Sequence, residues 1–108
     1  MKEITVEELS KKLNKGEKDQ PFILDVRESF EYQISNIDGT LIPLKQLNDR
    51  LDEIEEYKET EVVVMCRSGG RSAQATRFLE AQGFEDVKNL KGGINQWAKT
   101  IDDSLPVY

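Results

Sequence analysis

The sequence predicts an α/β domain, a small and mainly parallel sheet of five strands with helices on both faces. Short apolar runs alternate along the chain with segments of helical periodicity, the pattern of repeated strand–helix units. The run at 61–65 is apolar from Val62 to Met65, as expected of a central strand buried on both faces. A chain of 108 residues can bury one core of this kind, so we expect a single domain over 1–108.

The first half of the chain should supply three strands and two helices. Ile4 marks a short opening strand, and Thr5 stands three residues before Glu8, which is the spacing of a helix capping box. Leu9 and Leu13 then share one face of that helix, which we expect to stop at Gly16. The other elements expected in this half are strands at 22–26 and 40–42 and a short helix at 28–33.

The second half continues the alternation. Leu44, Leu47, Leu51 and Ile54 mark the apolar face of a helix that precedes the central strand. After that strand we expect a helix at 71–82 closed by Gly83, a strand at 87–90, a helix at 93–99 and an extended tail at 104–108. Trp97 and Tyr32 are expected to be core aromatics, because nothing beside them in the sequence suggests a ligand.

Cys66, the one cysteine of the chain, stands between the central strand and a glycine-containing turn. Strand, turn and helix in this order direct the N–H groups of the turn and the positive end of the helix dipole at one sulfur. Such a setting lowers a thiol pKa from about 8.5 toward neutrality. Gly69 and Gly70 permit positive φ, and Arg67 and Arg71 flank the turn, features that a merely buried cysteine does not need. The sequence therefore predicts a nucleophilic, anion-binding loop.

Asp25 lies near the end of the strand at 22–26, and Arg27 and Glu31 follow it. Sites in parallel sheets form at the carboxyl ends of strands, so these residues could support the loop that contains Cys66. Arg27 and Glu31 are four residues apart, however, and this spacing favours an ordinary ion pair on one helical turn. The chain has no histidine, which excludes a Cys–His mechanism and a histidine-containing zinc site, and we expect no metal.

Several segments resemble the signatures of single-domain rhodaneses, sulfurtransferases that carry sulfur as a cysteine persulfide. The matching segments are Leu24-Asp25-Val26-Arg27 with Glu31-Tyr32, the loop Cys66-Arg67-Ser68-Gly69-Gly70-Arg71-Ser72, and the closing stretch from Gly83-Phe84 through Asn89-Leu90 and Gly92-Gly93-Ile94 to Trp97. Together they extend the resemblance over residues 3–108. The pattern departs at 35–40, where Ser-Asn-Ile-Asp-Gly-Thr replaces the Gly-His-Ile-Pro-Gly-Ala usual in the family.

The resemblance implies a rhodanese-like fold and a two-step reaction. Cys66 would take the outer sulfur of a small anionic donor such as thiosulfate and hold it as a persulfide, with no other cofactor. The donor would be bound by Arg67, Ser68, Gly69, Gly70 and Arg71, while the backbone N–H groups of 67–71 stabilise the persulfide anion. Cyanide, a thiol or a protein would then accept the sulfur.

Two other functions fit part of this pattern. A cysteine and an arginine at the ends of a loop are also the plan of cysteine-dependent phosphatases, but those loops are longer than the four residues between Cys66 and Arg71. A non-catalytic rhodanese-like interaction module is the other alternative, although such modules often lack the cysteine or the arginines.

Composition limits the partners that we expect. The net charge of −6 argues against nucleic acid, because nucleic-acid binding depends on neutralising phosphates with cations. No apolar run is long enough for a membrane span or has the form of a secretory signal. With one cysteine and no signal, the cytoplasm is the expected location.

Overall fold

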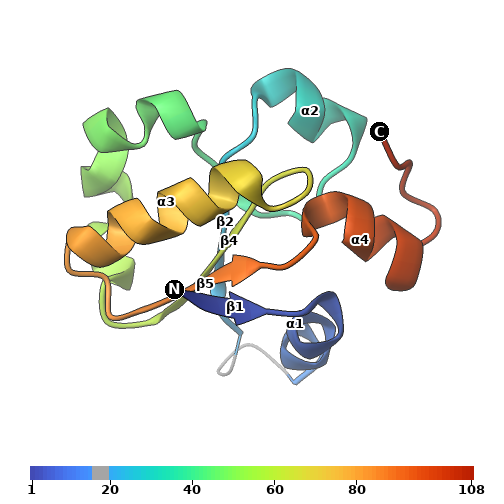
Figure 1. Ribbon diagram of the computed structural model, residues 1–108, viewed down its shortest axis with the longest axis horizontal. Coiled ribbons are helices and arrows are strands. Elements are labelled where there is room, and N and C mark those ends of the chain that lie inside the picture. Colours follow the sequence, from blue (N-terminus) through green and yellow to red (C-terminus); the bar gives the residue numbers. More distant parts are fainter. Residues whose placement is uncertain (16–19) are drawn as a thin grey trace.

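The computed structural model describes residues 1–15 and 20–108, in which the strands form one parallel sheet (Figure 1). The five strands are β1 (Lys2–Ile4), β2 (Phe22–Asp25), β3 (Thr40–Leu41), β4 (Glu61–Met65) and β5 (Asp86–Leu90). Their order across the sheet is β1-β5-β4-β2-β3, and each neighbouring pair of strands is parallel. The predicted α/β class and the central place of the strand at 61–65 are therefore confirmed.

Helices cover both faces of the sheet because the side chains of the central strand alternate between two cores. Val62 and Val64 pack in one core with residues of α3 (Gly70–Ala81) and of the segments before β4. Val63 and Met65 pack in the other with residues of α1 (Val6–Leu13) and α4 (Gly93–Thr100). Trp97 lies in this second core with 8% of its surface exposed, as predicted, whereas Tyr32 is half-buried.

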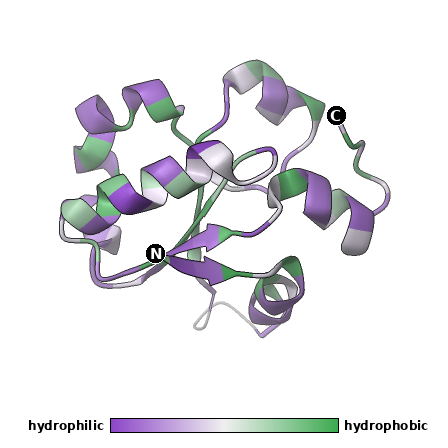
Figure 2. Ribbon diagram, in the orientation of Figure 1, coloured by the Kyte–Doolittle hydropathy of each residue, from purple (hydrophilic) through white to green (hydrophobic). Residues whose placement is uncertain are grey.

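Local capping explains where α1 begins. The Thr5 hydroxyl accepts a hydrogen bond from the Glu8 N–H at 3.1 Å, and the Glu8 carboxylate accepts one from the Thr5 N–H at 2.9 Å, which completes the predicted capping box. The helix ends at Leu13, and Gly16, the predicted stop, lies outside the described residues. Figure 2 shows hydrophobic and hydrophilic residues alternating along α3, whose buried residues are Ser72, Ala75, Thr76 and Leu79.

The helix predicted from Leu44 to Ile54 is instead formed by two 3₁₀ segments, Leu44–Gln46 and Asn48–Tyr57. Leu44 and Leu47 are three residues apart, and so are Leu51 and Ile54, which suits the three-residue turn of a 3₁₀ helix. Arg50 is non-helical, with φ of −119° and ψ of 19°, and it breaks the second segment. The predicted helical segment is therefore present, but as 3₁₀ helix broken at Arg50, and Leu47 and Ile54 are buried as expected.

The carboxyl ends of β2 and β4 meet at one edge of the sheet, where Asp25 is paired in register with Met65. Cys66 follows Met65 directly, and α2 (Ser29–Ile34) lies at the same edge. Figure 1 shows the C-terminal segment passing α4 and ending beside α2.

In the part of the chain that the structure describes, no helix has the length and apolar character needed to cross a membrane.

Candidate active site

The sulfur of Cys66 is surrounded by hydrogen-bond donors although the residue is only 1% exposed. The Gly69 N–H donates to Sγ at 3.1 Å and the Ser72 N–H at 3.4 Å. Ser72 belongs to the first turn of α3, where backbone N–H groups have no partner within the helix. The start of α3 therefore directs both its N–H groups and its dipole at the sulfur, as the order of elements predicted.

Two opposing effects set the pKa of Cys66. Burial raises the pKa, because a thiolate loses solvation in the interior. The Ser72 hydroxyl and the N–H groups of Ser72, Gly69 and Ser68 stabilise the thiolate, and their combined effect is larger. The pKa of Cys66 therefore lies below its ordinary value, which favours the nucleophilic form of the sulfur.

The shape of the loop depends on three glycines outside helical conformation. Gly69 has φ of +116°, as the sequence suggested, but Gly70 has ordinary backbone and begins α3. Gly92 and Gly93, which connect β5 to α4, also have positive φ. A Cβ on Gly93 would lie 2.5 Å from the carbonyl oxygen of Cys66, so only glycine allows α4 to approach the loop this closely.

Arg71 is bound to Glu31, a contact that the sequence spacing did not indicate. Its two terminal nitrogens contact the two carboxylate oxygens of Glu31 at 2.7 and 2.8 Å. This bidentate contact with Arg71 is the main reason why the pKa of Glu31 is lowered to about 2. Glu31 also accepts a hydrogen bond from the Glu28 N–H at 2.9 Å, which fixes the carboxylate at the start of α2. The pair fixes Arg71, the last residue of the loop, to α2.

The expected ion pair between Arg27 and Glu31 is not formed. Arg27 pairs instead with Asp25, at 2.7 Å between Nη2 and Oδ2, and both side chains are almost completely buried. Asp25 is two residues away, and its carboxylate also accepts the backbone N–H of Arg27 at 3.1 Å, so a local turn outcompetes the helical spacing. Arg27 reaches Glu31 through the carbonyl oxygen of that residue, at 3.3 Å.

The other two predicted loop residues face solvent. Ser68 is exposed, and it contributes its backbone N–H to the environment of the sulfur. Arg67 is also exposed, and its guanidinium carbon lies 5.1 Å from the ring centroid of Tyr108. Backbone groups of the loop therefore surround Cys66, Glu31 holds Arg71, and Asp25 and Arg27 form a separate buried pair.

Ser72, Asn89 and Tyr108 had no predicted role but lie in or around this site. The Ser72 hydroxyl is 3.3 Å from the sulfur and 2.5 Å from Asn89 Oδ1, and Asn89 Nδ2 donates to the Gly69 carbonyl at 3.2 Å. Ser72 and Asn89 belong to the segments that carry the sequence resemblance, so that resemblance was the available signal for them. Nothing in the sequence around Tyr108 marked it.

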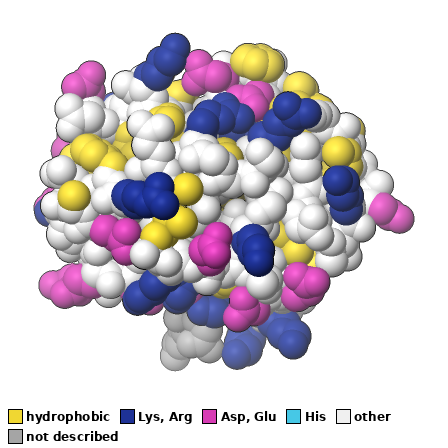
Figure 3. Space-filling view, viewed as in Figure 1, with side chains coloured by type: hydrophobic (Ala, Val, Ile, Leu, Met, Phe, Trp, Pro, Cys, Tyr) yellow, Lys and Arg dark blue, Asp and Glu magenta, His cyan; other side chains and the backbone are white. Residues whose placement is uncertain are grey.

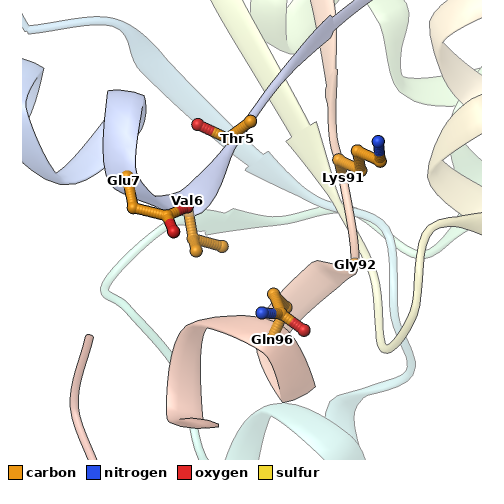
Figure 4. A pocket seen from close by; sticks show the side chains of 6 residues that line it. All are labelled: Thr5, Val6, Glu7, Lys91, Gly92 and Gln96. Carbon is orange, nitrogen blue, oxygen red and sulfur yellow. The ribbon is translucent and has the colours of Figure 1, made fainter. Parts of the chain in front are cut away.

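A separate hollow of about 390 Å³ lies between the start of α1 and the start of α4 (Figure 4). It is lined by Thr5, Val6, Glu7, Lys91, Gly92 and Gln96, and the loop 66–71 is not part of the lining given by the described residues. On the face shown in Figure 3, basic and acidic side chains are interspersed and form no broad basic surface.

The family model of the rhodanese-like domain matches residues 5–100. The chain belongs to the rhodanese-like domain family. This membership confirms the resemblance that the motifs indicated, and it includes the segment at 35–40 where the usual histidine is missing.

Two named proteins contain a segment similar to this chain. "Rhodanese-like/PpiC domain-containing protein 12, chloroplastic" of Arabidopsis thaliana is 36% identical over 100% of this chain and 38% of its own length. "Adenylyltransferase and sulfurtransferase UBA4" of Debaryomyces hansenii is 34% identical over 97% of this chain and 25% of its own length. The chain thus spans well under half of each of these two proteins.

A solved structure shows the same fold at the scale of the whole chain. The rhodanese-like domain protein from Staphylococcus aureus is 32% identical and superposes with a TM-score of 0.82. The alignment covers 100% of this chain and 99% of that protein. The fold and the family of this rhodanese-like domain are therefore established together.

Proposed function

We propose that this rhodanese-like domain is a sulfurtransferase that carries sulfur as a persulfide on Cys66. The observation that carries the proposal is the ring of donors around one buried sulfur, with N–H groups of Gly69 and Ser72 at 3.1 and 3.4 Å. These groups stabilise negative charge on sulfur in the thiolate and equally in the persulfide that replaces it. Relatives named as sulfurtransferases support the same activity.

In the first step, the Cys66 thiolate attacks the outer sulfur of an anionic donor. With thiosulfate, the new bond joins Sγ to the outer sulfur, the bond between the two donor sulfurs breaks, and sulfite leaves with the electron pair. Cys66 then carries an S–S⁻ group, and no oxidant or proton is consumed. No cofactor other than this covalent sulfur is required.

In the second step, a nucleophilic acceptor attacks the outer sulfur of the persulfide and regenerates the Cys66 thiolate. Cyanide would leave as thiocyanate, and a thiol would leave as a new persulfide. This is a ping-pong reaction, in which the donor product departs before the acceptor reacts. A protein thiol is a suitable physiological acceptor, and a reducing compartment such as the cytoplasm would keep Cys66 available.

The test is to measure the mass of the intact protein after treatment with thiosulfate. The proposal expects a gain of one sulfur atom, reversed by a thiol, together with thiocyanate formation when cyanide is added. Cys66→Ser should show neither, because a hydroxyl cannot carry the sulfur. We expect its rate to fall by more than about tenfold, equivalent to about 1.4 kcal/mol in the barrier.

Three outcomes would contradict the proposal. One is no sulfur adduct from either thiosulfate or a small organic persulfide, which would favour a non-catalytic interaction module. Another is substantial transfer by Cys66→Ser. The third is hydrolysis of aryl phosphates without any adduct, which would favour a phosphatase.

A further inference from the structure

We propose that Tyr108 is a positioning residue of this centre: its hydroxyl fixes the Glu31–Arg71 pair, and its ring holds Arg67 for an anionic sulfur donor. The inference rests on the proposed sulfur transfer and assigns a role to the segment after α4. It is based on two groups of contacts, one made by the hydroxyl and one by the ring.

The Tyr108 hydroxyl joins two ion pairs. It accepts a hydrogen bond from Arg27 Nη1 at 2.9 Å and lies 2.9 Å from Glu31 Oε1. Arginine cannot accept a hydrogen bond, so the single phenolic proton is donated to Glu31. Burial raises the pKa of Tyr108, which keeps this proton in place at neutral pH.

This hydroxyl completes the set of donors around Glu31. The same carboxylate accepts hydrogen bonds from both terminal nitrogens of Arg71 and from the N–H of Glu28. Arg27, behind it, is held by Asp25 and by the carbonyl oxygen of Ser35 at 2.8 Å. A rigid, buried anchor is therefore connected through Tyr108 to the residue that closes the active loop.

The ring of Tyr108 contacts Arg67 more closely than it contacts Arg27, whose guanidinium carbon is 5.9 Å from the ring centroid. The Arg67 guanidinium carbon is 5.1 Å from the ring centroid, a distance typical of a cation–π contact. Among the contacts of the described residues, Arg67 has neither a hydrogen bond nor a salt bridge from its guanidinium, whereas the charge of Arg71 is neutralised by Glu31. Arg67 is therefore the loop cation available to a donor anion, and the ring limits its freedom before the donor binds.

Tyr108 is itself held in place. Its N–H donates to Asn95 Oδ1 of α4 at 3.2 Å, and Leu105 and Tyr108 both pack against the core formed by α1, α4 and the sheet. The side chain therefore lies at the site because the segment before it is packed.

Two variants separate the hydroxyl from the ring. Tyr108→Phe keeps the ring, so the thiosulfate KM should stay within about twofold, while kcat falls about three- to tenfold as Arg71 and the loop lose their anchor. Tyr108→Leu removes both contacts, and KM should also rise about two- to fivefold, the effect of losing an exposed cation–π contact. Tyr57→Phe is the matched control. The ring of Tyr57 stacks on that of Phe22, with 3.8 Å between the two centroids, and does not contact the loop, so the kinetics of this variant should not change.

A double-mutant cycle tests whether the ring acts through Arg67. In an Arg67→Ala background, Tyr108→Leu should raise KM no further, because the cation that the ring positions is already gone. A general loss of structure would instead raise KM by the same factor in both backgrounds. Thermal unfolding of each variant identifies any that is unfolded at the assay temperature, in which case Tyr108→Phe and Arg67→Ala still test the two contacts separately.

The outcomes distinguish this inference from the proposed function. The positioning role would be overturned if Tyr108→Phe and Tyr57→Phe had equal kinetics. It would also be overturned if Tyr108→Leu raised KM as much in the Arg67→Ala background as in the wild type. In both cases sulfur transfer by the wild type would persist. Absence of the sulfur adduct in the wild type would overturn the proposed function itself, and this inference with it.

Discussion

Replacing Glu31 with glutamine should remove a pH-dependent part of the stability. Arg71, which binds both carboxylate oxygens, is the main reason why the pKa of Glu31 falls to about 2 from an ordinary 4.5. A carboxyl whose pKa is lower in the folded state stabilises the fold above its unfolded pKa. The contribution is therefore complete above about pH 5 and is lost as the pH falls toward 2.

The size of the effect follows from the pKa and the exposure of the pair. The lowered pKa corresponds to about 3 kcal/mol of stability at neutral pH. The Arg71 side chain is 36% exposed and Glu31 is 6% exposed, so water screens part of the interaction. We expect Glu31→Gln to lose about 2 kcal/mol at pH 7 and less than half of that at pH 3.

Urea unfolding of the wild type and the variant at both pH values measures these differences. Glu53→Gln is the control, because Glu53 also binds an arginine through two contacts, with Arg50 at 2.7 and 2.9 Å, but on the exposed surface. Its stability should change little. An equal loss in the two variants, or a Glu31→Gln effect that is the same at pH 7 and pH 3, would refute the reasoning.

Two further substitutions test the loop. Gly93→Ala should lower both the unfolding temperature and the sulfur-transfer rate, because the new Cβ would meet carbonyl oxygens of the loop. Gly83→Ala is the control, because Gly83 also has positive φ, at +94°, but a Cβ there would meet no other atom. It should lower the stability by about 1–2 kcal/mol without loss of activity. Ser72→Ala should raise the pKa of Cys66, seen as slower alkylation by iodoacetamide near pH 6. Ser35→Ala, which removes a buried hydroxyl without a partner among the described residues, should leave that alkylation unchanged, and equal rates in both serine variants would contradict the assigned hydrogen bond.

The sequence predicted the fold well because its signals were local. Alternating apolar runs and the capping box at Thr5 depend on residues a few positions apart, and the structure contains the strands and the helix that they predict. The 3₁₀ type of the helical segments before β4 was not predicted, because a spacing of three and four residues fits either helix type until the surrounding packing selects one. Local patterns do not contain that packing.

The candidate site was only partly predictable for the same reason. Cys66 and its loop are contiguous, so the order of strand, turn and helix was enough to predict where the sulfur would lie. The partner of Arg71 lies forty positions away, and Tyr108 reaches Glu31 across seventy-seven. Charge spacing instead suggested that Arg27 would pair with Glu31, because a near neighbour in sequence is the simplest partner when the tertiary fold is unknown.

The close approach of α4 has a consequence for how the loop holds charge. The Ile94 N–H binds the carbonyl oxygen of Cys66 at 2.9 Å, and the Asn95 N–H binds that of Arg67 at 3.2 Å. A planar trans peptide carries its C=O and N–H on opposite edges, so fixing the carbonyl of Arg67 toward α4 turns the N–H of Ser68 toward the sulfur. The orientation of the peptide between Arg67 and Ser68 is thus imposed from outside the loop, by α4, and does not depend on a bound donor. The contribution of the Ser68 N–H to the site is therefore a property of the backbone, which side-chain substitution within the loop does not remove.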